Sequence, residues 1–192
     1  MKTKTLLALA VLLFANVANS QITKNNWLVG GNVNFSSSQY RGDVSVIEDV
    51  LTVDIETKIG YFFIDKFVSG LITNFSHRKT KVPGVANTAM TVTIFSLGPY
   101  LRYYFLQKDN RVNAFAETSY QYGSFKNNTG FGNHVTYKIN SFSFSAGPVM
   151  YFNTTVGMEF TLGYLHSKYV NHSDHSNHIL IGLGLQIHLE KD

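Results

Sequence analysis

The sequence predicts an all-β fold in which eight antiparallel strands close into an up-and-down barrel. Eight segments alternate apolar and polar residues with a period of two, which indicates strands with one apolar and one polar face. No segment shows a convincing helical period. The connections between the segments are alternately short and long, so one rim is expected to carry tight turns and the other to carry loops.

The predicted strands follow one another along a single domain that spans residues 21–192. In the second strand, the odd positions from Leu51 to Phe63 are mostly apolar, whereas Glu56 and Lys58 lie between them. The fifth strand is weaker, because Phe115 falls on its polar face. The predicted strands cover residues 27–36, 51–63, 67–77, 93–105, 112–122, 141–152, 155–167 and 178–189.

Residues 1–20 have the pattern of a secretory signal peptide. A positively charged start is followed by an apolar run over residues 5–15, and the small residues Ala18 and Ser20 stand where a signal peptidase cuts. The run is too short for the alternative, a membrane-anchoring helix. The sequence therefore predicts an exported chain from which residues 1–20 are removed.

The charge balance argues against a nucleic-acid partner. The chain has 16 Lys and Arg residues against 12 Asp and Glu residues. Without Lys2 and Lys4 of the signal peptide, the net charge falls to about +2, which is too weak to attract nucleic acid. There are no cysteines, so the exported chain is expected to be held by packing and hydrogen bonds without disulfides.

The composition of the polar face indicates which face of the barrel meets lipid. In a soluble carrier the apolar face points inward around a ligand, whereas in a transmembrane barrel it points outward. Glycine weakens a strand and offers no contact, but a narrow eight-stranded lumen needs small residues on its wall. The small residues of the polar face are Gly60, Gly70, Gly98, Gly123, Gly147, Gly157, Gly163, Gly182, Gly184, Ser96, Ser141, Ser143 and Ser145. The sequence therefore predicts a transmembrane β-barrel whose polar face lines the lumen.

Aromatic residues on the apolar face form two predicted girdles, as expected where amphipathic rings meet a membrane interface. From Trp27 to Phe35 the strand rises roughly 26 Å, or about 20 Å of membrane height at the usual tilt. One girdle, near the short turns, consists of Trp27, Tyr61, Phe63, Phe67, Tyr103, Phe105 and Phe152; the other, near the long loops, consists of Phe35, Phe75, Phe95, Tyr120, Tyr122, Phe142 and Tyr164.

Five charged residues of the polar face stand at similar heights above the short turns. Because buried charges must be paired to be tolerated, they are predicted to form one ionic layer low in the lumen. The favoured interpretation is a structural plug that fixes strand register and closes the lumen, and the alternative is a gated or narrow ion path. The five residues are Glu56, Lys58, Arg102, Glu117 and Glu159.

Three segments carry a resemblance to a known family. Residues 95–105, FSLGPYLRYYF, and residues 144–152, FSAGPVMYF, share Phe-Ser-x-Gly-Pro followed by aromatic residues, and residues 115–123 read FAETSYQYG. With the signal peptide and the alternating strands, they resemble the small outer-membrane β-barrel proteins common in Bacteroidetes, whose architecture is that of OmpX and the OmpA barrel. The resemblance covers essentially the whole mature chain. Because Pro99 and Pro148 lack a ladder donor, we expect a bulge or local irregularity at each.

The segment NHSDHSNH, residues 171–178, holds the sharpest constellation of possible metal ligands. Imidazole and carboxylate groups suit zinc, copper or nickel. The spacing matches no established site, and a polar external loop explains these residues without a metal. The candidate ligands are His172, Asp174, His175 and His178.

Two further motifs carry functional hypotheses. The sequence Arg-Gly-Asp at residues 41–43 occurs in some adhesins, although a loop turn explains it better. The pairs Ser76–His77 and His166–Ser167 stand near the height at which some barrels carry a lipid-modifying site. Adjacent residues in a strand point to opposite faces, so neither pair can serve alone as nucleophile and base.

The sequence thus predicts a non-enzymatic integral outer-membrane barrel with no cofactor, since no phosphate loop, metalloprotease motif or catalytic triad signature is present. The expected partners are outer-membrane lipid and an extracellular partner bound through four external loops, and the chain is expected to be a monomer. Two alternatives remain open. One is a secreted lipocalin-like barrel that carries a small apolar ligand, and the other is a lipid-modifying outer-membrane enzyme.

Overall fold

The computed structural model describes residues 22–41, 47–81, 89–129 and 134–190. The predicted signal peptide and Gly42-Asp43 of the Arg-Gly-Asp sequence lie outside these residues. The described strands are β1 (Trp27–Arg41), β2 (Ile47–Ile64), β3 (Phe67–Lys81), β4 (Met90–Tyr104), β5 (Val112–Asn128), β6 (His134–Tyr151), β7 (Val156–Tyr169) and β8 (His175–Leu189). None of these ranges contains a helix long and apolar enough to cross a membrane.

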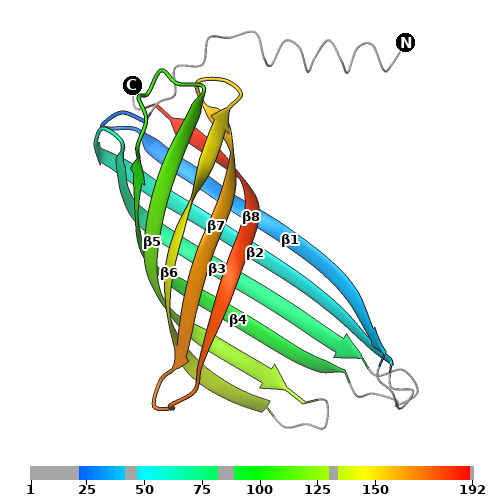
Figure 1. Ribbon diagram of the computed structural model, residues 1–192. Helices are drawn as coiled ribbons and strands as arrows, with labels where there is room; N and C mark the ends of the chain where they lie inside the picture. Colours follow the sequence, from blue (N-terminus) through cyan, green and yellow to red (C-terminus); the bar gives the residue numbers. More distant parts are fainter. Residues whose placement is uncertain (1–21, 42–46, 82–88, 130–133, 191–192) are drawn as a thin grey trace, which may run out of the picture.

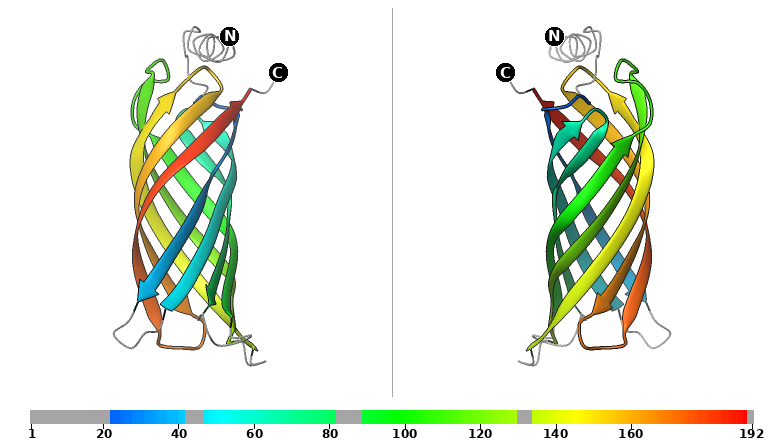
Figure 2. Two further views of the ribbon diagram at one scale, coloured as in Figure 1. Left: turned by 90° about the vertical axis from the view of Figure 1, so that its right-hand side faces the viewer. Right: turned by 90° about the vertical axis from the view of Figure 1, so that its left-hand side faces the viewer.

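Each strand pairs antiparallel with the next, and β1 pairs with β8, so the sheet closes on itself (Figure 1). Side views show the strands wrapping obliquely around a tall cylinder (Figure 2). The predicted eight-stranded antiparallel up-and-down barrel is therefore confirmed. Trp27 pairs with Leu189, so the first and last strands meet at one rim, beside the turns that follow β2, β4 and β6.

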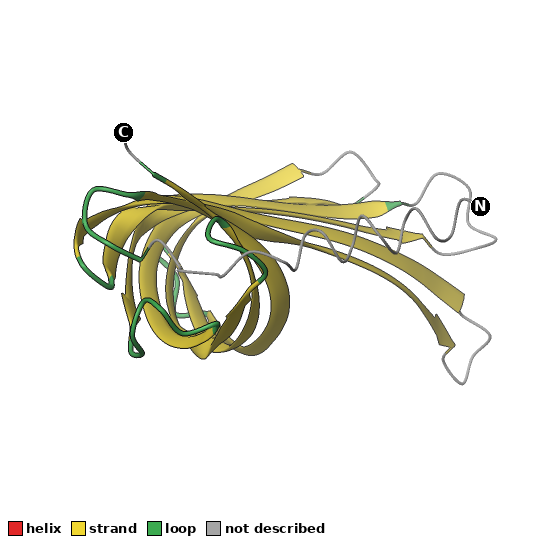
Figure 3. Cartoon of the chain, turned by 90° about the horizontal axis from the view of Figure 1, so that it is seen from above, coloured by secondary structure: helices red, strands yellow, loops and turns green. Residues whose placement is uncertain are grey.

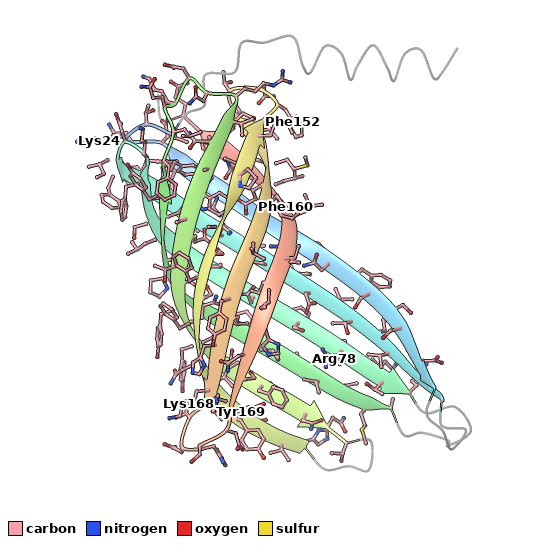
Figure 4. The ribbon with its side chains drawn as sticks, viewed as in Figure 1. Lys24, Arg78, Phe152, Phe160, Lys168 and Tyr169 are labelled. Atoms are coloured by element: carbon pink, nitrogen blue, oxygen red, sulfur yellow. The ribbon has the colours of Figure 1, made fainter. Side chains whose placement is uncertain are left out.

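The two faces of the wall are arranged as the period of two predicts. Outward side chains are apolar and exposed, with Val33 at 68% and Ile181 at 69% exposure. Inward side chains such as Lys58, Arg102 and Gln186 are buried. Side chains stand out from the wall along its whole height (Figure 4). This distribution argues against a soluble lipocalin-like carrier, in which the apolar side chains would line the interior.

The strands are longer than the apolar pattern indicates. At the turn rim the connections are residues 65–66, 105–111 and 152–155. At the opposite loop rim residues 170–174 connect β7 to β8, and the other three connections include residues outside the described ranges. Parts of the expected loops therefore continue as strand, for example residues 37–41 and 47–50 between the first two predicted strands. Polar segments can do this because the ladder satisfies their backbone groups, and Thr and Tyr favour extended structure.

The two Gly-Pro pairs interrupt the ladder without shifting its register. Between β4 and β5 the pairing stops after Leu97 and resumes at Tyr100, and between β6 and β7 it stops after Ala146 and resumes at Val149. A Cβ on Gly98 or Gly147 would collide with a carbonyl oxygen of the neighbouring strand. The expected irregularity is thus a local gap where a glycine lets two backbones approach closely, and no bulge forms there.

The barrel is closed by a short seam between β1 and β8. Only five residue pairs join these strands, from Trp27–Leu189 to Gly31–Leu185, whereas β1 pairs with β2 over the whole length of β1, from Trp27–Tyr61 to Arg41–Ile47. Beyond Gly31 and Leu185, no pairing between the two strands continues in the part of the chain that the structure describes. Viewed from above, the ring is round near the turn rim, and several strands extend sideways from it toward the loop rim (Figure 3).

Candidate functional site in the lumen

The structure brings the five predicted charged residues into one network inside the barrel. The layer contains two cations and three carboxylates. Lys58 on β2 reaches Glu117 on β5 with an Nζ–Oε1 distance of 3.0 Å and Glu159 on β7 at 3.6 Å. It also lies 3.2 Å from Glu56, which is two residues earlier on the same strand and whose side chain is 23% exposed. We call these residues, with Arg102, the ionic layer.

Arg102 on β4 is the centre of the ionic layer, and its side chain is fully buried. Its Nε donates to Glu117 Oε2 at 2.7 Å, and its Nη1 donates to Glu159 Oε2 at 2.6 Å. Nη1 also lies within hydrogen-bonding distance of Gln186 Oε1, and the guanidinium carbon lies 4.1 Å from the ring centroid of Phe115. A buried guanidinium is tolerated only when its donors are satisfied in this way.

An aromatic plug, which is absent from the predictions made from the sequence, fills the lumen between the ionic layer and the turn rim. Phe62 stacks on Tyr104 at 6.0 Å, and His188 lies 5.5 Å from the rings of both Phe62 and Tyr151. The period of two predicts Phe115 on the polar face, and the other rings likewise occupy inward-facing positions of their strands. The plug consists of Phe62, Tyr100, Tyr104, Phe115, Tyr151 and His188, all nearly inaccessible to solvent.

Hydroxyl and amide side chains occupy the lumen on the other side of the ionic layer. Gln121 accepts hydrogen bonds from Asn74 at 2.7 Å and from Ser96 at 2.8 Å. It donates to Ser119 at 3.1 Å, and Ser119 is bonded to Ser143 at 2.7 Å. The small serines leave room for the amides in the narrow interior, as the glycine and serine content of the polar face predicts.

A notch of about 400 Å³ marks the point where β1 and β8 part. Its walls are mostly lipid-facing apolar side chains, but Asn32 and Glu56 contribute polar groups from the lumen side. Asn32 donates to Glu56 Oε1 at 3.2 Å, which keeps this carboxylate partly satisfied at the edge of the ionic layer. The lining residues are Gly31, Asn32, Val33, Ile55, Glu56, Thr57, Met158, Leu183, Gly184 and Leu185.

The predicted metal ligands do not assemble into a centre. Within the described residues, which include His172, Asp174, His175 and His178, no group of three or more His, Asp or Glu side chains could hold a metal ion. The reason is geometric. β8 begins at His175, so His175 and His178 project from opposite faces, and His172 packs on Tyr137 at 5.3 Å between ring centroids.

In the described part of the chain, the two histidines considered for lipid modification form no hydrogen bond or ion pair with a serine or an acidic side chain. His77 Nδ1 lies 3.0 Å from Thr93 Oγ1 on the next strand. His166 Nδ1 lies 2.7 Å from Asn177 Oδ1. Ser167 is instead bonded to Ser141 at 2.8 Å. The dyad of serine and histidine that an acyl-transfer site needs is thus not formed by these four residues.

Comparisons with known proteins agree with this architecture. A family model described as "Outer membrane protein beta-barrel domain" matches residues 5–186. No curated protein matches the sequence.

Similar solved structures include the N-terminal β-barrel domain of OprF from Pseudomonas aeruginosa, at 13% identity and a TM-score of 0.47, covering 86% of this chain and 98% of that one. Neisserial surface protein A shows 13% identity and a TM-score of 0.47, covering 84% of this chain and 96% of that one. The attachment invasion locus protein Ail of Yersinia pestis shows 14% identity and a TM-score of 0.49, covering 87% of this chain and 100% of that one.

Proposed function

Because the chain belongs to the outer membrane protein β-barrel domain family, we propose that it is a non-enzymatic integral outer-membrane protein with a closed lumen. The turn rim faces the periplasm and the loop rim faces the exterior. The protein serves the envelope as a structural element, and its loop rim is the surface available to an extracellular partner. It acts as a monomer, without cofactor.

The proposal of a closed lumen rests on the side chains that fill the barrel between the polar network and the turn rim. Arg102, Tyr104 and Tyr151 present at most 1% of their surface to solvent, so the cross-section near the turn rim is occupied by side chains. The charges that would attract an ion are already engaged with one another at 2.6 to 3.6 Å. A plug held by buried ion pairs is costly to open, because separating them leaves unpaired charges in a medium of low dielectric constant. The open alternative, a narrow ion path, lacks such support.

The first test is to express the chain in a Gram-negative host, to separate the membranes and to run the outer-membrane fraction heated and unheated on a denaturing gel. We expect a heat-modifiable band in that fraction, because a folded barrel migrates differently from its unfolded chain. A soluble periplasmic or secreted product would contradict the proposal.

The closed lumen is tested by conductance of the purified barrel in a planar lipid bilayer. We expect no steady conductance from the natural protein. A variant with Tyr104→Ser and Tyr151→Ser, shown to be folded by its gel shift, should conduct more, because two of the rings that fill the lumen are removed. Steady conductance of the unchanged protein would instead favour the ion path.

A further inference from the structure

The outward face of the barrel near the loop rim carries a regular set of lysines. On four strands, a lysine stands four residues beyond an outward aromatic residue, toward the loop rim. These pairs are Phe75 and Lys79 on β3, Tyr122 and Lys126 on β5, Phe142 and Lys138 on β6, and Tyr164 and Lys168 on β7. An even spacing in a strand keeps both members of each pair on the same face, so all four lysines project outward. We call Lys79, Lys126, Lys138 and Lys168 the lysine band.

The spacing sets the height of the lysine band above the hydrocarbon. Four residues of strand rise about 13 Å, which becomes about 10 Å along the membrane normal at the tilt of such barrels. The four aromatic side chains are between 40% and 49% exposed, as expected for rings at the interface. The ammonium groups therefore reach the layer of lipid headgroups. The Nζ of Lys138 lies 5.9 Å from the ring centroid of Tyr122, so this ammonium group also contacts the aromatic girdle.

Three members of the band are neighbours on adjacent strands. Ser124 on β5 pairs with Lys138 on β6, so Lys126 is the diagonal neighbour of Lys138. Asn140 pairs with Lys168 on β7, so Lys138 is likewise diagonal to Lys168. Diagonal residues of a sheet lie roughly 7–8 Å apart. Three positive charges thus form a row that repels itself unless anions lie between them.

The described residues of β5, β6 and β7 do not supply those anions to the row of three lysines. None of the four lysines forms a salt bridge with another residue in the described ranges. The outward faces of β5, β6 and β7 carry no acidic residue, because Glu117 and Glu159 both point into the lumen.

From this arrangement we propose that the lysine band binds the phosphate groups of glycolipids in the outer leaflet. Lysine is a compact cation that suits phosphate oxygens, and each lysine near an anionic membrane surface contributes about 1 kcal/mol of attraction. The inference rests on the proposed function, since it requires the loop rim to lie at the outer leaflet. The lipid is defined by its chemistry: a membrane-embedded glycolipid that presents phosphate at the level of the band.

The test compares two variants that lose the same charge at opposite rims. The band variant carries Lys126→Gln, Lys138→Gln and Lys168→Gln. The control variant carries Lys24→Gln, Lys108→Gln and Arg111→Gln, three exposed positions at the turn rim. Each protein is refolded in phosphatidylcholine vesicles, with or without diphosphorylated lipid A, and the temperature of the gel-shift transition and the lipid A retained on repurification are measured.

We expect lipid A to raise the transition temperature of the natural protein and of the control variant, and to be retained by both. The band variant should lose affinity for lipid A by roughly fivefold for each lysine removed. Equal retention by the band variant would overturn the inference. An equal rise with phosphatidylglycerol, or with inorganic phosphate in plain vesicles, would also overturn it, by reducing the effect to diffuse charge or to a free anion. If the natural protein forms no heat-modifiable band in plain vesicles, the proposed function fails and this inference falls with it; a folded band without a lipid A effect defeats the inference alone.

Discussion

From the turn rim to the level of Gly31 and Leu185, all eight strands pair around the ring, and the ionic layer and aromatic plug fill the interior. Beyond that level β1 and β8 separate, and the interior holds hydroxyl and amide groups in hydrogen bonds of ordinary length. The two halves of the barrel therefore differ in what holds them together. The turn-rim half supplies stability through buried contacts, whereas the loop-rim half is held mainly by its backbone ladder and can change sequence or shape at lower cost.

The largest contrast is expected from cross-linking across the seam. The chain has no natural cysteine, so pairs can be introduced without interference. Val29→Cys with Ile187→Cys joins paired positions and should oxidise nearly completely, because facing strand residues have the Cα separation of a disulfide. Phe35→Cys with Ile181→Cys continues the same register beyond the split and should remain reduced. The readout is gel mobility with and without reductant, and efficient oxidation of the second pair would show a wall closed along its full height.

The next largest effect is expected from Arg102→Met. The substitution leaves Glu117 and Glu159 buried with only Lys58 to balance them, and breaking a buried pair in this way costs about 3–5 kcal/mol. The free energy of unfolding in vesicles, measured by urea titration with the gel shift as readout, should fall by that amount. Adding Glu117→Gln and Glu159→Gln should restore part of it, because the uncompensated charges are then removed.

The matched control for this prediction is Arg78→Met in the loop-rim half. Arg78 is exposed, so its replacement should change the free energy of unfolding by less than about 0.5 kcal/mol. Equal losses at Arg102 and Arg78 would contradict the division of stability between the two halves.

A smaller effect is expected from alanine at two glycines. At Gly98 a Cβ would collide with the carbonyl oxygen of Tyr120, so Gly98→Ala should cost about 1–3 kcal/mol through the backbone shift it forces. At Gly182, in the loop-rim part of β8, the nearest atom to an added Cβ is Thr161 Cβ at 3.9 Å, an ordinary contact. Gly182→Ala should therefore be neutral within about 0.5 kcal/mol. The same urea titration compares the two, and a larger loss at Gly182 would be the opposite of this expectation.

The faces of the strands are predictable from sequence because a period of two leaves little choice once one face must meet lipid. The alternation that places Lys58, Arg102 and Glu159 inside the barrel also places the rings of Phe62, Tyr104 and Tyr151 there. These rings are overlooked when only the charged members of the polar face are considered. An aromatic residue at an inward-facing position of a strand, close to a short turn, is the sequence signal that identifies the plug.

The seam and the length of the strands are not available from the pattern. Apolar alternation ends where the membrane ends, but the ladder continues through polar residues because it satisfies backbone groups, not side chains. The extent of pairing between β1 and β8 depends on the total twist of the eight strands. That total cannot be read from the sequence of any one strand. For the same reason the notch at Gly31 and Leu185 emerges only from the assembled ring.

The short seam also bears on the order in which the molecule folds. Every other strand pair joins neighbours in the sequence, so seven hairpin contacts can form locally, whereas Trp27 and Leu189 must come together from opposite ends of the domain. Contacts between distant residues are slow to form, because the chain must close a long loop before they are made. Because the seam has only five residue pairs, β1 and β8 need to align over only a short length when the barrel closes. The domain can therefore form its hairpins first as a curved open sheet. Pairing of β1 with β8 over a short length at the turn rim then closes the sheet into a barrel.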